Sequence, residues 1–74
     1  MKFKELRAVF NGWLIRIITS GEAGEAQEEI SLLNAAYAEE KLAKYDEADV
    51  ARFTSSTMEW NGEEYPALEV VLDV

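Results

Sequence analysis

The side chains that most often carry catalysis and metal binding are missing from this sequence. It contains no histidine and no cysteine, which removes the commonest general base, the thiolate nucleophile and the preferred zinc ligands. A serine nucleophile would need a carboxylate or a lysine as its base, and the pair Ser55-Ser56 falls within a strand-like segment. A chain of 74 residues also leaves little room for a substrate pocket. We therefore expect no enzymatic activity and no cofactor.

Carboxylates in close pairs are the remaining groups with potential chemistry. The pairs are Glu28 with Glu29, Glu39 with Glu40, Asp46 with Asp49, and Glu63 with Glu64. None of them has the alternating Asp or Asn positions, the glycine and the closing glutamate of a calcium loop. The four glycines are scattered, so the chain also lacks a glycine-rich phosphate loop. We expect solvated surface charges here and no metal site.

A group of aromatic and acidic residues surrounds the dipeptide Asn61-Gly62. Its members are Glu59, Trp60, Glu63, Glu64 and Tyr65. Trp and Tyr are favoured anchors in protein interfaces, and carboxylates steer a basic partner toward such anchors. These five residues therefore predict a partner-binding surface. The alternative interpretation is structural, with Trp60 and Tyr65 forming a cross-strand pair that stabilises the end of a β-ribbon.

Those residues must be positioned by a C-terminal hairpin, with strands at about 50–60 and 65–74. Asn-Gly between apolar runs is the strongest short-range hairpin signal, because both residues tolerate the positive φ of a tight turn. A two-residue loop would place Glu59 opposite Glu64, a destabilising like-charge pair. The sequence therefore favours a four-residue loop, residues 61–64. That loop pairs Trp60 with Tyr65 and Arg52 with Asp73.

The period-two alternation of the hairpin assigns its faces. The core face of the second strand is expected to carry Leu68, Val70, Leu72 and Val74. The same face of the first strand would carry Ala51, Phe53, Ser55 and Thr57. Pro66 lacks an N–H donor, so its strand should lie at a sheet edge there or begin just after it.

The N-terminal part predicts a short helix followed by a central strand. Apolar residues at helical spacing share one side of residues 1–10, namely Phe3, Leu6, Val9 and Phe10. Gly12 should end this helix in the left-handed conformation that glycine adopts without penalty. Residues 13–18 are bulky and nearly continuously apolar, as in a central strand. We expect Trp13, Ile15 and Ile17 to face the core and Arg16 to point outward among the acids.

The segment from Gln27 to Tyr45 has two interpretations, after an acidic loop at residues 20–26. It could form one long helix, since Ala, Glu, Leu, Lys and Gln are strong helix formers. Alternatively, residues 28–33 form a strand paired with residues 13–19, and Asn34 caps a helix that runs to Tyr45. The alternation of Ile30 and Leu32 favours the strand followed by a helix, and the long helix stays open.

The charge balance is strongly acidic and uneven. Fifteen acidic residues against seven basic ones give a net charge of −8. Residues 1–20 carry four bases and one acid, a balance of +3, whereas residues 21–74 carry three bases and fourteen acids, a balance of −11. We expect the two parts to attract each other. An acidic surface suits a basic protein partner and repels polyanions, so direct nucleic-acid binding is disfavoured.

Five short segments share their apolar spacing with a known group of small proteins. They are residues 5–10, 12–18, 42–45, 49–50 and 68–72. In this spacing the chain resembles small acidic α+β proteins encoded by prophages and integrative mobile elements, anti-CRISPR inhibitors among them. The resemblance implies a short helix, a strand pair, a second short helix and a closing hairpin. It also implies an inhibitor that occupies nucleic-acid sites on host proteins, and it carries no functional residue over to this sequence.

Together these features predict one α+β domain over residues 1–74, with a mainly antiparallel sheet of three or four strands and two short helices packed on one face. The lack of cysteine, the charged start and the short apolar block at 13–18 lead us to expect a cytoplasmic protein outside the membrane. The leading functional hypothesis is a non-enzymatic binding protein whose acidic surface inhibits a basic host protein. One alternative is an assembly module that forms a homodimer through a sheet edge. Another is a single-stranded nucleic-acid binder that uses Arg16 and Arg52 on the sheet face.

Overall fold

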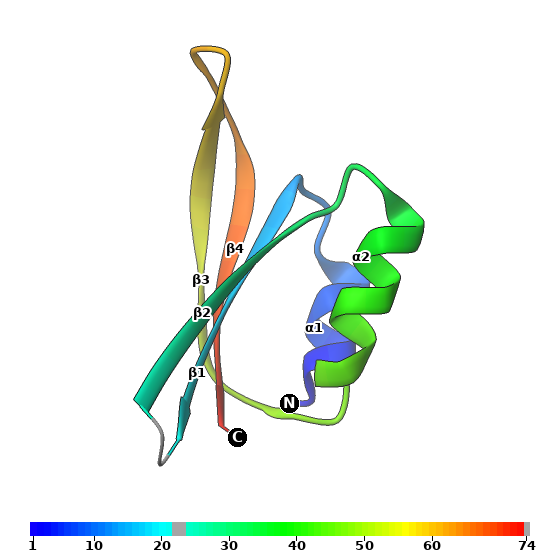
Figure 1. Cartoon of the computed structure of the whole chain (residues 1–74), viewed down its shortest axis with the longest axis vertical. Coiled ribbons are helices and arrows are strands. Elements are labelled where there is room, and N and C mark those ends of the chain that lie inside the picture. Colours follow the sequence, from blue (N-terminus) through cyan, green and yellow to red (C-terminus); the bar gives the residue numbers. More distant parts are fainter. Residues whose placement is uncertain (22–23, 74) are drawn as a thin grey trace.

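A four-stranded sheet carries two short helices on one of its faces in the computed structural model, which describes residues 1–21 and 24–73 (Figure 1). The elements in chain order are α1 (Phe3–Val9), β1 (Leu14–Gly21), β2 (Gly24–Ser31), α2 (Ala35–Leu42), a short 3₁₀ turn η1 (Ala43–Tyr45), β3 (Asp49–Trp60) and β4 (Glu63–Asp73). The expected α+β fold with two helices on one face is confirmed.

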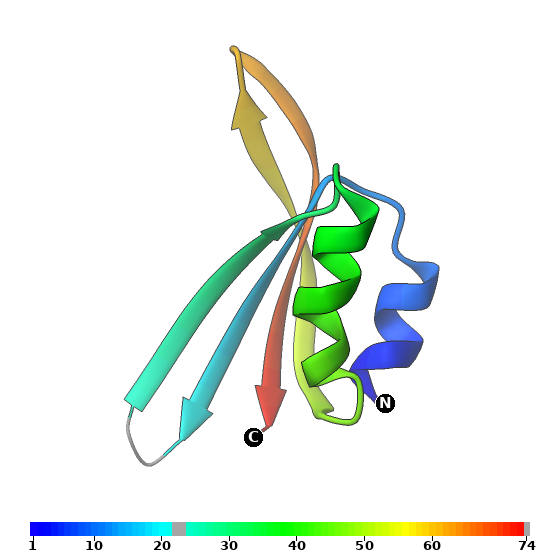
Figure 2. The ribbon, with the colours of Figure 1, turned by 45° about the vertical axis from the view of Figure 1, so that its right-hand side comes forward.

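The strand order is β2-β1-β4-β3, with two antiparallel hairpins joined by a parallel pair. β1 pairs antiparallel with β2, β4 pairs antiparallel with β3, and β1 runs parallel to β4. The pairing of β1 with β4 begins at Leu14 and Ala67, so the end of the C-terminal hairpin extends past the rest of the sheet. Figures 1 and 2 show this extension as a two-stranded ribbon. We call residues 57–66 the arm.

The core lies between the helices and the sheet. Its buried members are Phe3, Leu6, Ile15, Ile17, Ile30, Ala38, Leu42, Leu68, Val70 and Leu72. The predicted core face of β4 and the inward Ile15 and Ile17 are thereby confirmed, whereas Val74 lies outside the described residues. Trp13 was expected among them, but it precedes β1 and its side chain is 37% exposed.

A bulge near the start of β3 changes which residues of that strand reach the core. The register shifts between Val50 and Arg52, so Val50 lies opposite Leu72 and packs against the core. Ala51, expected on the core face, is exposed instead. Phe53, opposite Val70, keeps the predicted face but is 50% exposed. β3 is the outermost strand, and the helices do not cover its middle.

The hairpin turn has two residues, so the predicted four-residue loop is wrong. Asn61 and Gly62 both have positive φ, 51° and 80°, and Trp60 pairs with Glu63. This turn brings Glu59 opposite Glu64. The match between an Asn-Gly turn and the strand twist outweighs the repulsion of two water-exposed carboxylates, which is worth only about 0.2–1 kcal/mol. The expected partner of Arg52 is also wrong, since Arg52 lies opposite Val71.

Pro66 lies where β4 pairs with β3 alone, as the edge prediction required. It sits opposite Thr57, beyond the last pair that joins β4 to β1. Its carbonyl oxygen accepts a hydrogen bond from the Trp13 N–H at 2.9 Å. The missing N–H of Pro66 therefore costs the sheet no hydrogen bond.

The strand followed by a helix is the correct interpretation of residues 27–45, but the strand begins earlier. β2 starts at Gly24 and ends at Ser31, so described residues of the expected loop at 20–26 belong to β1 and β2. Asn34 is the N-cap of α2, and its Oδ1 accepts a hydrogen bond from the Tyr37 N–H at 3.0 Å. In the strand, the backbone groups of β2 form hydrogen bonds with β1. A longer helix would have lost this pairing.

Gly12 is required for a different reason from the one expected. Positive φ among the described glycines is found at Gly62, so Gly12 does not enter the left-handed region. A Cβ at Gly12 would overlap the ring of Phe10 and lie 2.9 Å from the carbonyl oxygen of Pro66. Close approach of the backbone to β4, and not turn geometry, excludes a side chain at this position.

Replacing Asn34 with Ala should lower the free energy of unfolding by about 1 kcal/mol, because the Tyr37 N–H loses its acceptor at the helix N-terminus. Urea unfolding followed by circular dichroism measures the difference. Asn34→Asp is the matched control, since aspartate also caps helices, and it should stay close to the original stability. Equal losses in both variants would contradict the capping role.

Candidate binding surface

The five residues predicted to bind a partner all lie at or near the end of the arm. Glu59, Trp60, Glu63 and Glu64 are exposed, and Tyr65 is half-buried. The side chain of Trp60 is 61% exposed, although Trp is among the most apolar interface residues. Register places Trp60 with Glu63 on one face of the ribbon and Glu59 with Glu64 on the other. We call these four exposed residues the arm tip.

Tyr65 is held by Trp13 and not by Trp60. The rings of Trp13 and Tyr65 have centroids 4.3 Å apart and planes inclined by 33°. The Tyr65 hydroxyl donates to Glu63 Oε2 at 2.7 Å, and this hydrogen bond raises the pKa of Tyr65. The expected cross-strand pair of Trp60 with Tyr65 is therefore wrong. Among the described residues, the Trp60 ring forms no aromatic pair, so it is available to another molecule.

Trp13 is a residue that sequence reasoning assigned to the wrong place. Its ring packs on Tyr65 where the arm leaves the sheet. The backbone N–H of Trp13 donates to the carbonyl oxygen of Pro66, the neighbour of Tyr65 in the chain, and this hydrogen bond holds Trp13 there. Its position directly after Gly12, one residue before the regular strand, was the available signal. An aromatic residue at a strand entrance can pack on a neighbouring strand end as readily as into the core.

The N-terminal bases are each paired with an acid from the later part of the chain. The ion pairs are Lys2 with Asp49 at 3.1 Å, Lys4 with Glu47 at 2.7 Å, Arg7 with Asp46 at 2.6 Å and Glu39 at 2.8 Å, and Arg16 with Glu29 at 3.0 Å and Glu69 at 3.3 Å. The expected attraction between the two parts of the chain is thus seen in the structure. The cluster of Lys2, Lys4 and Arg7 is engaged internally.

Arg7 is the centre of the strongest of these contacts. Its guanidinium donates two hydrogen bonds to Asp46, from Nε at 2.6 Å and from Nη2 at 2.9 Å, and further ones to Glu39. The side chains of Arg7 and Asp46 are mostly shielded from water. These hydrogen bonds lower the pKa of Asp46 and of Glu39 and raise the pKa of Arg7. The network ties α1 to α2, through Glu39, and to the segment before β3, through Asp46.

The arm tip, in contrast, carries charges without counter-ions. None of Glu59, Glu63 and Glu64 forms an ion pair with any residue that the structure describes. The bases of the described chain that take no part in ion pairs are Lys41 and Arg52. Lys41 lies over the Tyr37 ring on α2. Three carboxylates without an ion-pair partner among the described residues therefore lie beside the exposed Trp60.

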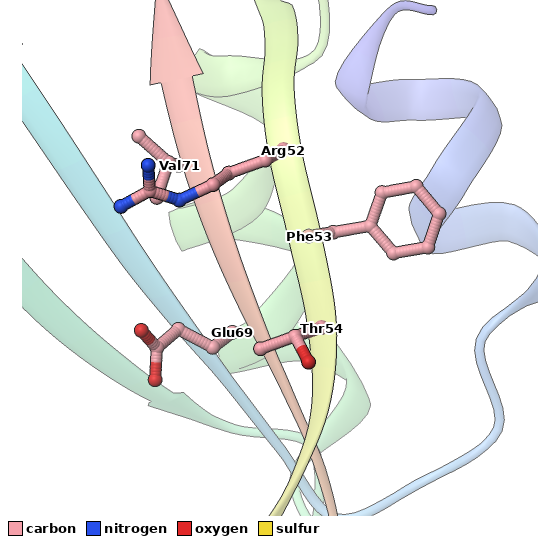
Figure 3. Close-up of a pocket in the computed structure, with 5 residues that line it drawn as sticks. All are labelled: Arg52, Phe53, Thr54, Glu69 and Val71. Carbon is pink, nitrogen blue, oxygen red and sulfur yellow. The ribbon is translucent and has the colours of Figure 1, made fainter.

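The open face of the sheet, opposite the helices, has a shallow hollow lined by Arg52, Thr54, Glu69 and Val71, with Phe53 at its rim. Figure 3 shows the Phe53 ring pointing to the opposite side of β3 from the Arg52 guanidinium. Arg16 beside this hollow is held by two carboxylates, as expected of an outward arginine among acids. The hollow thus holds the guanidinium of Arg52, which forms no ion pair among the described residues, and the carboxylate of Glu69, which Arg16 engages.

Searches against protein-family models, curated proteins and solved structures found no match to this chain. Within residues 1–21 and 24–73, no cluster of three or more acidic side chains is arranged to hold a metal ion. The helices of this described part are too short and too polar to cross a membrane.

Replacing Arg7 with Gln should lower the free energy of unfolding near neutral pH by about 1–3 kcal/mol, the usual worth of hydrogen bonds to a charged group. Because Arg7 depresses the pKa of Asp46 and Glu39, both stabilise the fold above about pH 4. That contribution disappears as the pH falls through their folded-state pKa. Urea unfolding near pH 7 and near pH 3 should show a smaller acid-induced loss for the variant than for the original protein.

The control for this prediction is Arg52→Gln, which removes the same charge from a residue without an ion pair. It should leave both the neutral-pH stability and the acid-induced loss nearly unchanged. Parallel behaviour of the two variants would show that the Arg7 contacts do not set the pH dependence.

Proposed function

We propose that this chain is a small non-enzymatic binding protein whose arm tip inserts into the basic surface of another protein. The proposal includes a nucleic-acid-binding host protein as the partner, a phage or mobile-element origin, and inhibition by occupying the site that a nucleic acid would use. The observation that carries it is the arm tip itself. It combines a Trp side chain that is 61% exposed with three glutamates that have no ion-pair partner among the described residues.

The shape of the arm supports insertion into a groove. It is a two-stranded ribbon that extends past the helices and the neighbouring strands (Figure 2). Its two faces both end in acids, with Glu63 beside Trp60 and with Glu59 opposite Glu64. A groove lined with Lys and Arg could therefore contact carboxylates on both sides of the ribbon while Trp60 supplies an apolar anchor.

The like-charge pair at the tip supports the same proposal. Glu59 and Glu64 lie directly opposite each other, which destabilises the free hairpin. Cations from a partner would relieve this repulsion on binding. Part of the binding free energy would then come from a strain that the free protein carries at its binding surface.

A nucleic-acid-binding sheet face receives less support. Arg16 is already engaged by Glu29 and Glu69, which leaves Arg52 as the free cation of that face among the described residues. A single cation on a protein of net charge −8 attracts a polyanion weakly. Binding of a single strand would have to overcome repulsion from the rest of the surface.

Charge reversal at the arm tip should abolish partner binding. A bait carrying Glu59→Lys, Glu63→Lys and Glu64→Lys is compared with the original protein in pull-downs from nuclease-treated lysate of the host cell. The original protein should retain a basic protein that the triple variant loses, and retention should weaken as salt rises, because screening reduces the attraction between opposite charges.

The matched control changes the net charge equally at a distance from the tip. Glu25, Glu40 and Asp73 are exposed and form no ion pair among the described residues, so each is replaced by Lys in a second triple variant. This bait should keep most of the binding. Equal loss in both baits would show that net charge, and not the arm tip, determines partner binding.

A further inference from the structure

The outer edge of β3 is covered at its first residues and open along the rest. The N–H of Val50 donates to the carbonyl oxygen of Met1 at 2.9 Å, and Lys2 forms an isolated antiparallel bridge with Asp49. The N-terminal residues thus pair with the start of this edge as a short antiparallel strand would. Beyond the bulge, over residues 52–60, β4 is the one strand of the described chain that pairs with β3.

Pro66 determines which backbone groups point to the open side. It has no N–H, so its pair with Thr57 must be a non-hydrogen-bonded pair of the antiparallel ladder. Such pairs alternate with hydrogen-bonded ones, and the register is regular over residues 52–60. The N–H and C=O groups of Phe53, Ser55, Thr57 and Glu59 therefore point outward, away from β4.

The two edges of the sheet differ in how well they resist pairing with another strand. β2, the other outer strand, has exposed acids at Glu25 and Glu29, and charged side chains discourage edge pairing. β3 carries no charge from Phe53 to Met58 in a protein that is otherwise strongly acidic. A long uncharged edge strand with unpaired backbone groups readily accepts another strand.

We propose that a second copy of this chain pairs antiparallel with β3 over residues 52–60, about a two-fold axis at Ser56. The two four-stranded sheets then continue into one. A two-fold axis perpendicular to a sheet keeps each side chain on its own face. Residues opposite each other must then share a face, and because side chains alternate along the strand, this requires one residue to lie opposite its own copy at the axis. Ser56 is the midpoint of the stretch that begins after the bulge and ends at the turn, so this register uses the whole open edge.

The same register pairs the outward backbone groups with each other. Ser55 lies opposite Thr57 of the second copy, and Phe53 lies opposite Glu59 of the second copy. Each of these hydrogen-bonded pairs exchanges two N–H···O bonds. Two copies of Ser56 face each other at the axis. A hydroxyl can both donate and accept a hydrogen bond, so the two serine side chains can bond to each other.

Two side chains left without a partner in the single chain also meet in this register. Arg52 forms no ion pair among the described residues, and Trp60 is 61% exposed. Both lie on the open face, because Arg52 is opposite Val71 and Trp60 is opposite Glu63. Pairing about Ser56 sets Arg52 directly across from Trp60 of the second copy, where the guanidinium can stack on the indole ring.

Salt distinguishes this contact from the basic-partner interaction. Two chains of net charge −8 repel each other, and salt screens this repulsion. The dimer should therefore become tighter as salt rises, whereas binding of a basic protein should become weaker. Each copy uses its β3 edge in this contact, and the exposed acids of β2 discourage pairing at the other edge. Association therefore stops at two copies and does not continue into a fibre.

The sharpest test uses a single engineered thiol in this cysteine-free chain. In Ser56→Cys the two thiols face each other across the axis, in a pair whose Cα atoms are about 4.5 Å apart, within disulfide range. Oxidised glutathione should convert the variant to a covalent dimer, seen by non-reducing electrophoresis. In Thr54→Cys, the matched control, the two thiols lie four residues apart along the strands, about 13 Å, and cross-linking should be at least about tenfold slower. Equal rates, or no dimer from Ser56→Cys, would overturn the proposal.

Sedimentation of the unmodified protein supplies the second measurement. At concentrations up to about 1 mM, the dimer fraction should rise between about 0.01 M and 1 M salt, as the Debye length falls from about 30 Å to 3 Å. Ser55→Pro should weaken association at least about tenfold, because it removes an outward N–H, while circular dichroism stays unchanged, since Pro66 already occupies the same kind of position on β4. A protein that stays monomeric in high salt, or a folded Ser55→Pro variant that dimerises fully, would refute this interface.

Discussion

The structure depends on the parallel pairing of β1 with β4. Ile15 lies beside Leu68 and Ile17 beside Val70 in this pair, and all four side chains are buried. The pair joins two hairpins that come from opposite ends of the chain, and both helices cover the face that it presents. A two-stranded hairpin alone is marginally stable in water. The parallel pair therefore turns two marginal units into one domain with a shared core.

The binding surface follows from the unequal lengths of these strands. β1 stops pairing at Leu14, opposite Ala67, while β3 and β4 continue to the turn at Asn61. The ribbon beyond that point has no sheet neighbour to hide its side chains. At the other end of the chain the N-terminal bases hold α1 against the acidic segment between α2 and β3. Electrostatic attraction thus stabilises the body of the protein, whereas the glutamates at the arm tip have no ion-pair partner among the described residues.

Most of the architecture was readable from periodicity and from turn residues. The alternation of Leu68, Val70 and Leu72 identified the buried face of β4, and Asn34 marked the start of α2.

The predictions were wrong where two short-range preferences competed or where contacts between distant segments decided the structure. The like-charge pair suggested a longer loop, but turn geometry prevailed. The parallel register, the bulge and the packing of Trp13 on Tyr65 depend on contacts between segments far apart in the chain, which local patterns do not encode. The arm-tip residues were found because their types are unusual together at a turn, while their projection beyond the sheet required the strand lengths.

The bulge at Ala51 has a consequence for the orientation of the whole arm. Val50 is anchored toward the core, and the extra residue shifts the alternation that follows by one position. If Ala51 took part in regular alternation instead of a bulge, a strand leaving Val50 would carry Trp60 on the helix side of the sheet and Glu59 on the open side. One backbone position, about ten residues from the tip, thus selects which of the two faces displays the indole. Deleting Ala51 would make the ladder regular and leave each tip side chain on its present face. A strand that kept Ala51 but lost the bulge would present every tip side chain on the opposite face.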